Sequence, residues 1–292
     1  MDIVITYVDG LDPAWQKVYE ETVGVSMNQK RFRDWGTLPY LLRGIEKYMP
    51  FIRNVWLVVA MDSQVPSWVD RERVKVVLHR DIIPEHLLPL FNAGSIEIFL
   101  PRITGLDEEF LYFNDDFFPL RPSRPSDFFR DGRICTGYKA HLFATSLFKK
   151  RVWTSDRAAR RFAGLRPSPV FHRPQHICSP MLRSVCLDLY EREAQEICAS
   201  VTPLRTPDNF NQCLYMDYLY YTGHALNRPI SRKFFSMATH DIDGIRRFML
   251  APGADFMCVN DVNMPEERYH RSRQVLLDTF ARILPEKSSF EL

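Results

Sequence analysis

The segment that decides the predicted fold is residues 110–118, which read Phe110-Leu111-Tyr112-Phe113-Asn114-Asp115-Asp116-Phe117-Phe118. Its continuous apolar first half is typical of a strand that is buried on both faces of a parallel sheet. Asp115 and Asp116 follow at the carboxyl end of that strand, the edge where α/β sheets bind ligands. Because adjacent carboxylates among aromatic residues need a cation or hydrogen-bond donors, a divalent ion carrying substrate phosphates is a natural partner. The alternative is a solvated Asn-Asp-Asp turn.

Strand-like and helix-like segments alternate on the N-terminal side of this strand. Apolar runs at 2–8, 54–60 and 74–79 are predicted strands, and residues from about 37 have the apolar spacing of an amphipathic helix. Asp12 before Pro13 predicts a helix start. The acidic turn at Asp9 and Gly10 is typical of nucleotide-binding sheets, although Asp-Gly is also a hairpin signal. The alternation predicts an α/β fold with a mostly parallel sheet flanked by helices.

The pattern changes beyond residue 130. Residues 149–169 are rich in Arg and Lys and predict an exposed basic helix, either simply solvated or receiving an anionic acceptor. A long amphipathic helix is predicted after His176, through about Ala199. An aromatic helix with four tyrosines follows near residue 218, and its rings are expected to lie in the core and to line a groove. Residues 255–261 predict a further strand that ends in Asn260 and Asp261, and residues 265–280 a last helix.

Composition excludes several classes of protein. The 292 residues, 46% of them hydrophobic, suffice for one large α/β domain. A net charge of +2 argues against general binding to nucleic acid or to a membrane surface. No apolar run approaches the ~20 residues of a spanning helix, and the N-terminus resembles no signal peptide. The six cysteines include no Cys-x-x-Cys pair, which predicts reduced, mostly buried thiols in a cytosolic protein without a zinc site.

Four groups of motifs, in order along nearly the whole chain, resemble those of the Stealth proteins. The first contains Asp9 and Gly10, and the second runs from Arg31 to Asp116. The third contains His172-Arg173-Pro174-Gln175-His176 together with Arg205, and the fourth is Cys258-Val259-Asn260-Asp261. The family comprises bacterial capsule and exopolysaccharide phosphotransferases and the animal lysosomal-enzyme N-acetylglucosamine-1-phosphotransferase.

The resemblance implies a Rossmann-like, glycosyltransferase-A-like core with a helical insertion and a divalent metal. It implies transfer of a hexose-1-phosphate, for example N-acetylhexosamine-1-phosphate, from a UDP-sugar to a glycan hydroxyl, with release of UMP. Residues 1–130 would form the half that binds the nucleotide sugar, and residues 131–292 the helical, acceptor-side segment that completes the same catalytic domain. Alignment to the animal enzyme places four residues on catalytic positions, namely Glu97, Asp116, His176 and Arg205.

Each of these residues is expected to have a distinct role. Asp116, helped by Asp115 and Asp261, would hold Mg²⁺ or Mn²⁺. Arg205 would bind a phosphate, and His176 would accept the acceptor proton. Glu97 would orient His176, hold sugar hydroxyls or act as the base. Nucleotide or sugar contacts are expected from Asp9, Gly10, Arg31, Asp34, Asn92, Asp208 and Asn260.

Each role has a structural alternative. Glu97 could be an outward-pointing acid on a helix surface, and His176 a structural hydrogen-bonding residue. Arg205 could pair with Asp208 at a helix start.

Two other functions remain open from the sequence. One is a metal-dependent glycosyltransferase that releases UDP, and the other is a non-catalytic glycan-binding protein. A nucleotide-sugar donor and a polysaccharide or other glycan acceptor are the expected partners, and nucleic acid is not. The expected location is the cytoplasm. The sequence leaves open whether the protein also associates with a membrane assembly at the inner face of the membrane through the basic segment after Phe148.

Overall fold

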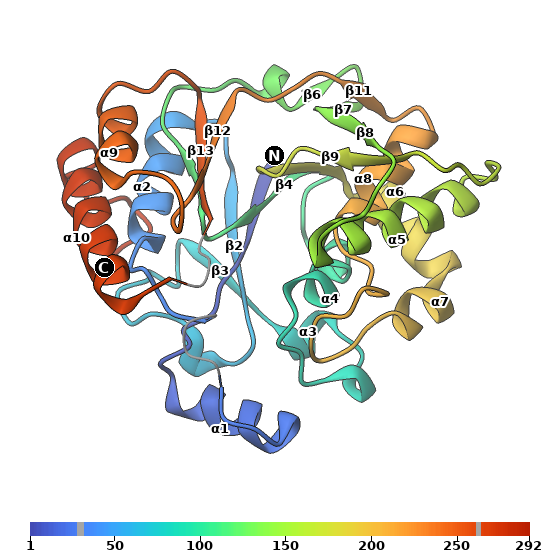
Figure 1. Ribbon diagram of the computed structural model, residues 1–292, viewed down its shortest axis with the longest axis horizontal. Helices are drawn as coiled ribbons and strands as arrows, with labels where there is room; N and C mark the ends of the chain where they lie inside the picture. The colour runs from blue at the N-terminus through green and yellow to red at the C-terminus, as the bar shows by residue number, and fades with distance from the viewer. Residues whose placement is uncertain (28–31, 261–263) are drawn as a thin grey trace. The chain divides into compact units, whose positions relative to one another are not determined.

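A five-stranded sheet forms the centre of the α/β fold (Figure 1). The computed structural model describes residues 1–27, 32–260 and 264–292. The strand order is β10-β4-β1-β2-β3 and the sheet is mostly parallel. Its strands are β1 (Asp2–Thr6), β2 (Asn54–Val59), β3 (Val74–Leu78), β4 (Glu109–Asn114) and β10 (Ser179–Leu182). The predicted fold class and the four predicted N-terminal strands are therefore confirmed.

Strand β4 has the burial that its apolar run predicts. Phe110 through Phe113 are all fully buried, which explains why both faces of the strand are apolar. β10 pairs with β4 in the antiparallel direction, with Ser179 opposite Tyr112. The long helix predicted between His176 and Ala199 is therefore wrong in its first part. Residues 179–182 are all buried. In so short an apolar run, the hydrophobic pattern of a helix cannot be distinguished from that of a strand.

Three smaller sheets accompany the central one. The first has the order β12-β13-β5 and contains β5 (Phe117–Pro119), β12 (Arg232–Ser236) and β13 (Phe256–Asn260). The second has the order β11-β7-β6 and contains β6 (Phe129–Arg130), β7 (Arg133–Thr136) and β11 (Ala225–Asn227). The third pairs β8 (Tyr138–His141) with β9 (Phe171–Pro174). β13 confirms the strand predicted near the C-terminus.

The chain divides into two compact units, each discontinuous in sequence. The first unit contains residues 1–4, 77–112 and 125–230, and the second contains residues 5–76, 113–124 and 231–292. Helices of the first unit are α3 (His79–Ile82), α4 (Ala93–Glu97), α5 (Leu147–Phe162), α6 (Arg183–Arg192), α7 (Ala194–Ala199) and α8 (Cys213–Tyr221). Helices of the second are α1 (Pro13–Val23), α2 (Leu38–Tyr48), α9 (Ile242–Leu250) and α10 (Glu266–Ile283). The expected division at residue 130 stays a prediction.

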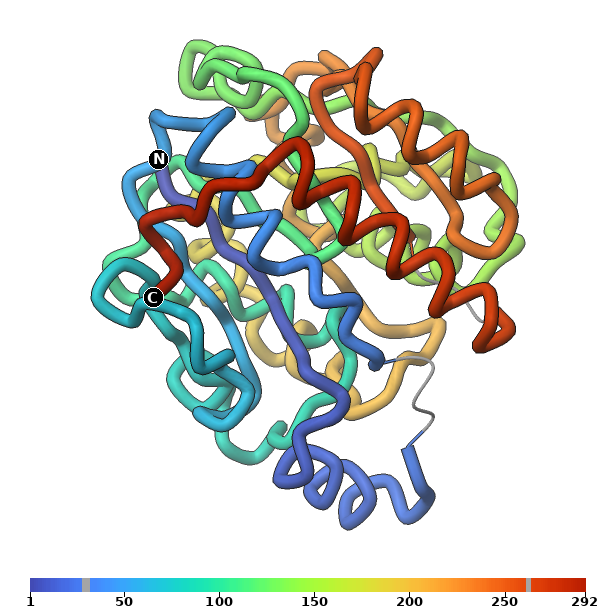
Figure 2. The backbone as a smooth tube through the Cα atoms, turned by 90° about the vertical axis from the view of Figure 1, so that its left-hand side faces the viewer, coloured from blue at the N-terminus to red at the C-terminus, as the bar shows by residue number. Residues whose placement is uncertain are grey.

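The helices of the second unit pack against one another through their apolar faces. α9 and α10 lie side by side, and α10 runs along α2 (Figure 2). Tyr40 of α2 stacks on Phe280 of α10 with ring centroids 5.2 Å apart. At α1 the predicted start is confirmed, since the Asp12 carboxylate accepts from the Ala14 N–H at 2.9 Å. The helix stops at Gly24, whose φ of 75° suits glycine.

Helix α5 of the first unit corrects the prediction of an exposed basic helix. Ser146 caps its start by accepting from the Lys149 N–H at 3.2 Å. One of its faces is buried and carries Arg151, Ser155 and Asp156, so only part of the helix is solvated.

Two predictions from composition can be compared with the structure. All six cysteines are free, and five of them are buried, as predicted. Among the described residues, no helix has both the length and the apolar character required to span a membrane.

Candidate active site

In the second unit, the turn between β1 and α1 is held by Gln64, a residue that is 1% exposed. Its Oε1 accepts from the Asp9 N–H at 2.7 Å, and its Nε2 donates to the Asp9 carbonyl at 3.0 Å. Gly10 lies in the same turn, where its N–H donates to the Phe32 carbonyl. A Cβ on Gly10 would lie 2.1 Å from that carbonyl oxygen, so only glycine fits. The sequence analysis singled out Asp9 and Gly10 as candidates but not Gln64, which holds their turn in place.

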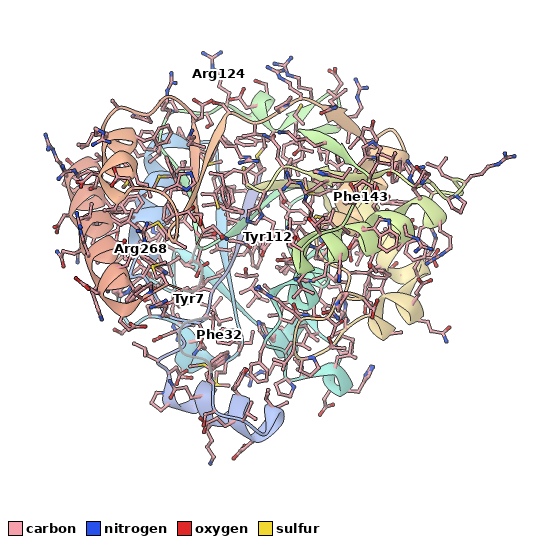
Figure 3. All side chains as sticks on the ribbon, viewed as in Figure 1. Tyr7, Phe32, Tyr112, Arg124, Phe143 and Arg268 are labelled. Atoms are coloured by element: carbon pink, nitrogen blue, oxygen red, sulfur yellow. The ribbon has the colours of Figure 1, made fainter. Side chains whose placement is uncertain are left out.

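Three acidic side chains act electrostatically on Tyr7 of this unit, a residue that is labelled in Figure 3. Burial, followed by the charges of Asp34, Asp9 and Asp115, raises the pKa of Tyr7 far above its usual value. Tyr7 and Asp34 share a side-chain hydrogen bond. Burial also raises the pKa of Asp34, with Asp9 adding to the effect and the Gly36 N–H opposing it. Three predicted site residues, one from the first motif and two from distant parts of the second, are thereby brought together, and their summed negative charge is suited to a cation.

Asp116 lies at the start of β5, beside β13. The Val259 N–H donates to its carbonyl at 2.9 Å, and the Cys258 thiol lies 3.5 Å from its Oδ2. Because β5 and β13 are paired with Cys258 opposite Phe117, the ends of the two strands bring Asn260 to the region of Asp115 and Asp116. The carboxylates at the end of β4 and the amide at the end of β13 therefore belong to one corner of the unit.

The donor set in this corner fits a hard divalent cation. It contains the Asp115 and Asp116 carboxylates and the Asn260 amide, which offer oxygen ligands of the kind that Mg²⁺ and Mn²⁺ bind. Burial, followed by the charge of Asp116 and its hydrogen bond with the thiol, raises the pKa of Cys258 well above its usual value. Asp261, the third predicted metal ligand, lies outside the described residues, as does Arg31.

In the first unit, Glu97 at the end of α4 is 5% exposed. It accepts from the Tyr112 hydroxyl at 3.0 Å and from the Gln212 N–H at 3.2 Å. The alternative of an outward-pointing surface acid is therefore wrong. These two donors compensate the carboxylate for the loss of water and fix its position.

Two buried asparagines shape the loop that carries Arg205 and Asp208. Asn92 donates to Asn209 Oδ1 at 2.8 Å and to Ser95 Oγ at 2.9 Å. Asn209, which sequence reasoning missed, also accepts from the Thr206 N–H at 2.6 Å. The donor atoms of Asn92 are thus engaged inside the unit, which gives it a positioning role. Arg205 and Asp208 are exposed, and within the described residues no ion pair joins them.

Gln175 fixes the segment that presents His176. Its Oε1 accepts from the N–H groups of Gly137 at 3.0 Å and Ile230 at 2.7 Å, and its Nε2 donates to the Ile230 carbonyl at 3.1 Å. The half-buried His176 ring lies against Phe148, with ring centroids 5.5 Å apart. The first unit therefore holds Glu97, Asn92, His176, Arg205 and Asp208, whereas the second holds Asp9, Gly10, Asp34, Asp115, Asp116 and Asn260.

A hydrogen-bonded group that the sequence did not reveal surrounds Asp156 on α5. The Tyr221 hydroxyl donates to Asp156 Oδ1, and the His172 N–H donates to the same oxygen at 2.8 Å. His172 Nδ1 lies 2.8 Å from the Tyr221 hydroxyl. Burial raises the pKa of Asp156 and lowers that of His172. Asp217, fully buried nearby, has its pKa raised well above the usual value by burial and by the Asp156 charge.

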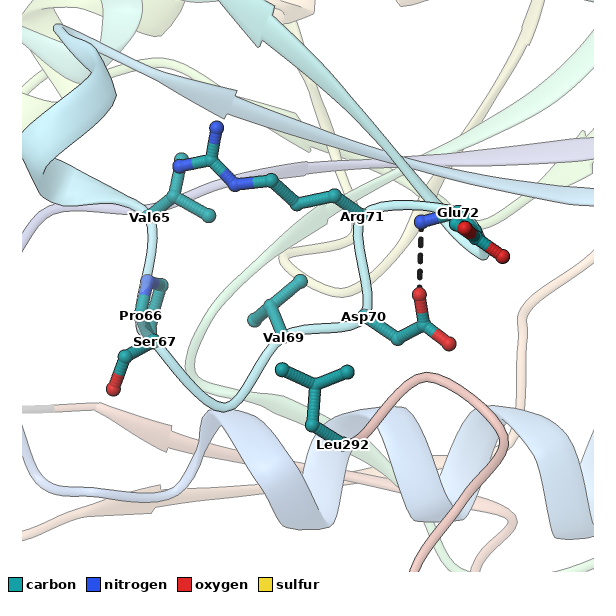
Figure 4. Close-up of a pocket in the computed structure, with 8 residues that line it drawn as sticks. All are labelled: Val65, Pro66, Ser67, Val69, Asp70, Arg71, Glu72 and Leu292. Atoms are coloured by element: carbon teal, nitrogen blue, oxygen red, sulfur yellow. Dashed lines mark hydrogen bonds between the residues drawn. The ribbon is translucent and has the colours of Figure 1, made fainter.

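A surface pocket of about 520 Å³ lies elsewhere in the second unit (Figure 4). It is formed by residues 65–67 and 69–72 together with Leu292. Within it, the Glu72 N–H donates to Asp70 Oδ1 at 2.8 Å. None of the predicted site residues lines this pocket.

Comparison with known proteins gives matches over the whole chain. Residues 31–136 match the family model of Stealth protein conserved region 2. The chain is 32% identical to the receptor polysaccharide phosphotransferase WefC of Streptococcus oralis, covering all of this chain and 99% of that protein. It is 31% identical to the capsular polysaccharide phosphotransferase WcwK of Streptococcus pneumoniae, with the same coverage of both chains.

Two solved structures are also similar. One is the galactosyltransferase LgtC in complex with donor and acceptor sugar analogues, with a TM-score of 0.40 and 13% identity over 94% of this chain and 95% of that chain. The other is mouse xyloside xylosyltransferase 1, with a TM-score of 0.42 and 10% identity over 90% of this chain and 99% of that chain. The sequence matches, at over 30% identity across complete chains, show that this protein belongs to the Stealth family.

Proposed function

We propose that the protein is a sugar-1-phosphate transferase of capsule or exopolysaccharide synthesis. The proposed reaction moves a hexose-1-phosphate from a UDP-sugar to a hydroxyl of a glycan acceptor. An acceptor oxygen attacks the phosphorus that carries the sugar, and the bond from that phosphorus to the oxygen of the nucleoside phosphate breaks. The products are a phosphodiester and UMP. The observation that carries this proposal is the match over complete chains to proteins named polysaccharide phosphotransferases.

In the proposed mechanism the second unit binds the donor. Asp116, with Asp115 and Asp261, would hold Mg²⁺ or Mn²⁺, which when bound neutralises the diphosphate. The cluster of Asp9, Asp34 and Asp115 around Tyr7 supports a cation in this unit, because the mutual repulsion of carboxylates is relieved by positive charge. Asp9, Gly10, Arg31, Asp34 and Asn260 would contact nucleotide or sugar.

The first unit would supply the groups that act on the acceptor and the phosphate. His176 would take the proton of the attacking hydroxyl, which is a contribution of roughly 10²–10⁴-fold for general bases. Arg205 would donate to the phosphate oxygens, for which a guanidinium has suitable geometry. Glu97, fixed by Tyr112 and Gln212, would hold sugar hydroxyls, orient His176 or act as the base. Asn92 would keep the Arg205 loop in place, with Asp208 as a further substrate contact.

The partners and the location belong to the same proposal. We expect a nucleotide-sugar donor, a glycan acceptor and action in the cytoplasm at the inner face of the membrane. Phe143, 74% exposed, precedes the basic start of α5 (Figure 3). Residues 132–155 include no Asp or Glu, so this segment is suited to anionic surfaces. Failure to cosediment with anionic vesicles would remove the membrane contact and leave the transferase proposal intact.

The test is incubation with a panel of nucleotide sugars, Mg²⁺ and capsule oligosaccharide, followed by ³¹P NMR and identification of the released nucleotide. A phosphodiester resonance together with UMP supports the proposal. Release of UDP with no phosphodiester would identify a glycosyltransferase instead. Binding of the glycan with no turnover of any donor would identify a non-catalytic glycan-binding protein.

A further inference from the structure

Arg151 is a buried cation in the second turn of α5. It is 5% exposed, whereas its neighbour Lys150 is exposed. Its Nε and Nη2 atoms are buried and have no hydrogen-bond partner among the described residues. Guanidinium groups are strongly hydrated donors, so burial without acceptors is unfavourable unless an anion satisfies them. Two nitrogen atoms of this side chain therefore carry N–H groups that form no hydrogen bond with the described residues of the first unit.

The neighbouring backbone is shaped to admit this guanidinium. A Cβ built on Gly94 of α4 would lie 1.5 Å from Arg151 Nη2 and 2.8 Å from its Cζ. Both distances are far below van der Waals contact, so any side chain at residue 94 would displace the guanidinium. Gly94 lies between Asn92 and Glu97, two residues that the proposed function uses. The position of Arg151 thus depends on the same short helix that positions Glu97.

The charges around Arg151 favour an anionic ligand. Burial lowers the pKa of Arg151, the Glu97 carboxylate raises it, and the Arg205 guanidinium lowers it. Glu97 is engaged by Tyr112 and Gln212, and within the described residues it forms no ion pair with Arg151. Two guanidinium groups therefore act on each other beside a single carboxylate, which leaves a net positive charge. Forked N–H donors of this kind match the oxygens of a phosphate.

We infer that Arg151 is a phosphate-binding residue of the first unit, acting together with Arg205. Its guanidinium group donates to oxygens of a substrate phosphate group. This inference rests on the proposed function for the identity of the substrate, and the phosphate comes from either of two sources. One source is the diphosphate of the nucleotide sugar, and the other is a phosphodiester already present in the glycan.

The decisive variant is Arg151→Met, which keeps an unbranched apolar side chain and removes the charge. Binding of UDP with Mg²⁺, and separately of a methyl glycosyl phosphodiester, would be measured by isothermal titration calorimetry. We expect at least tenfold weaker binding of one of these probes, and the weakened probe identifies the source of the phosphate. The ligand-free variant should have the melting temperature of the parent or a higher one, because the substitution removes a buried cation that lacks a hydrogen-bond partner at Nε and Nη2. A merely structural arginine would instead lower the melting temperature and leave probe affinity unchanged.

Controls separate this effect from general damage. Arg157→Ala removes an exposed cation from the same helix, where it lies over Trp153, and should bind both probes as the parent does. Gly94→Ala should reproduce the Arg151→Met loss, and adding it to Arg151→Met should have little further effect on binding. Gly253→Ala, whose new Cβ would meet only Phe248 at 4.0 Å, is the matched glycine control.

Unchanged affinity of Arg151→Met for both probes overturns the inference, whatever the reaction products are. The proposed function fails on a different result, the release of UDP by the parent enzyme. Weakened probe binding in Arg151→Met would still support the phosphate contact in that case. If Gly94→Ala does not fold, the Arg151→Met measurement alone decides.

Discussion

Replacing Asn209 by alanine tests how the loop that carries Arg205 is held. The Asn209 side chain is fully buried and forms four hydrogen bonds in the structure. It accepts from Asn92 and the Thr206 N–H, and it donates to the Ser200 carbonyl at 2.6 Å and to Thr202 Oγ1 at 2.8 Å. At about 1 kcal/mol of net stabilisation for each bond, the variant should lose about 4 kcal/mol of unfolding free energy. Displacement of Arg205 by even 1 Å should also lower kcat/KM by about 10²-fold.

The assay is urea unfolding followed by tryptophan fluorescence, together with initial rates of donor turnover. Gln274→Ala is the matched control, because among the described residues this exposed amide forms one side-chain hydrogen bond, to Asp278 on the surface of α10. Its unfolding free energy should remain within about 0.5 kcal/mol of the parent. An Asn209→Ala protein that stays within about 1 kcal/mol of the parent and keeps full turnover would refute this account of the loop.

Three further predictions concern catalysis, packing and acid stability. Asp116→Asn and His176→Ala should each abolish transfer with little change in circular dichroism, and near-normal turnover in either variant removes that residue from the site. Gly10→Ala should cost about 1–3 kcal/mol of unfolding free energy, because its Cβ would lie 2.1 Å from the Phe32 carbonyl oxygen; a melting temperature equal to that of the parent would contradict the packing described for this turn. Burial lowers the pKa of His79 to about 4, so the unfolded chain binds this proton more tightly. Stability should therefore fall as pH drops from about 6.5 to about 4, by roughly 3 kcal/mol in total. His79→Leu should flatten the pH profile of the unfolding free energy between about pH 6.5 and about pH 4. An unchanged slope in this variant would contradict the role assigned to His79.

Local patterns predicted the elements whose signals lie within a few consecutive residues. The apolar run ending in Asp115 and Asp116 identified β4 because a strand buried on both faces needs no alternation. The Asp12-Pro13 pair identified the start of α1 because capping is a property of adjacent residues. The resemblance to the family then identified candidate site residues. In the structure, some of these residues belong to the first compact unit and the others to the second.

Residues whose roles depend on distant partners were not predicted. Asn209 is one polar residue in a loop, and its importance arises from contacts with Asn92, 117 positions away. Arg151 was counted among the exposed basic residues of 149–169, and nothing nearby indicates that Gly94 makes room for it. β10 was assigned to a helix because four buried residues carry no usable period.

The most direct test of the central claim uses a UDP-sugar labelled with ³²P in the phosphate that carries the sugar. After incubation with acceptor glycan and Mg²⁺, the glycan and the nucleotides are separated and counted. Sugar-1-phosphate transfer predicts that the label appears in the glycan in a 1:1 ratio with the transferred hexose, and that the released nucleotide is unlabelled UMP. Transfer of hexose to the glycan with all of the label remaining in UDP would contradict the account.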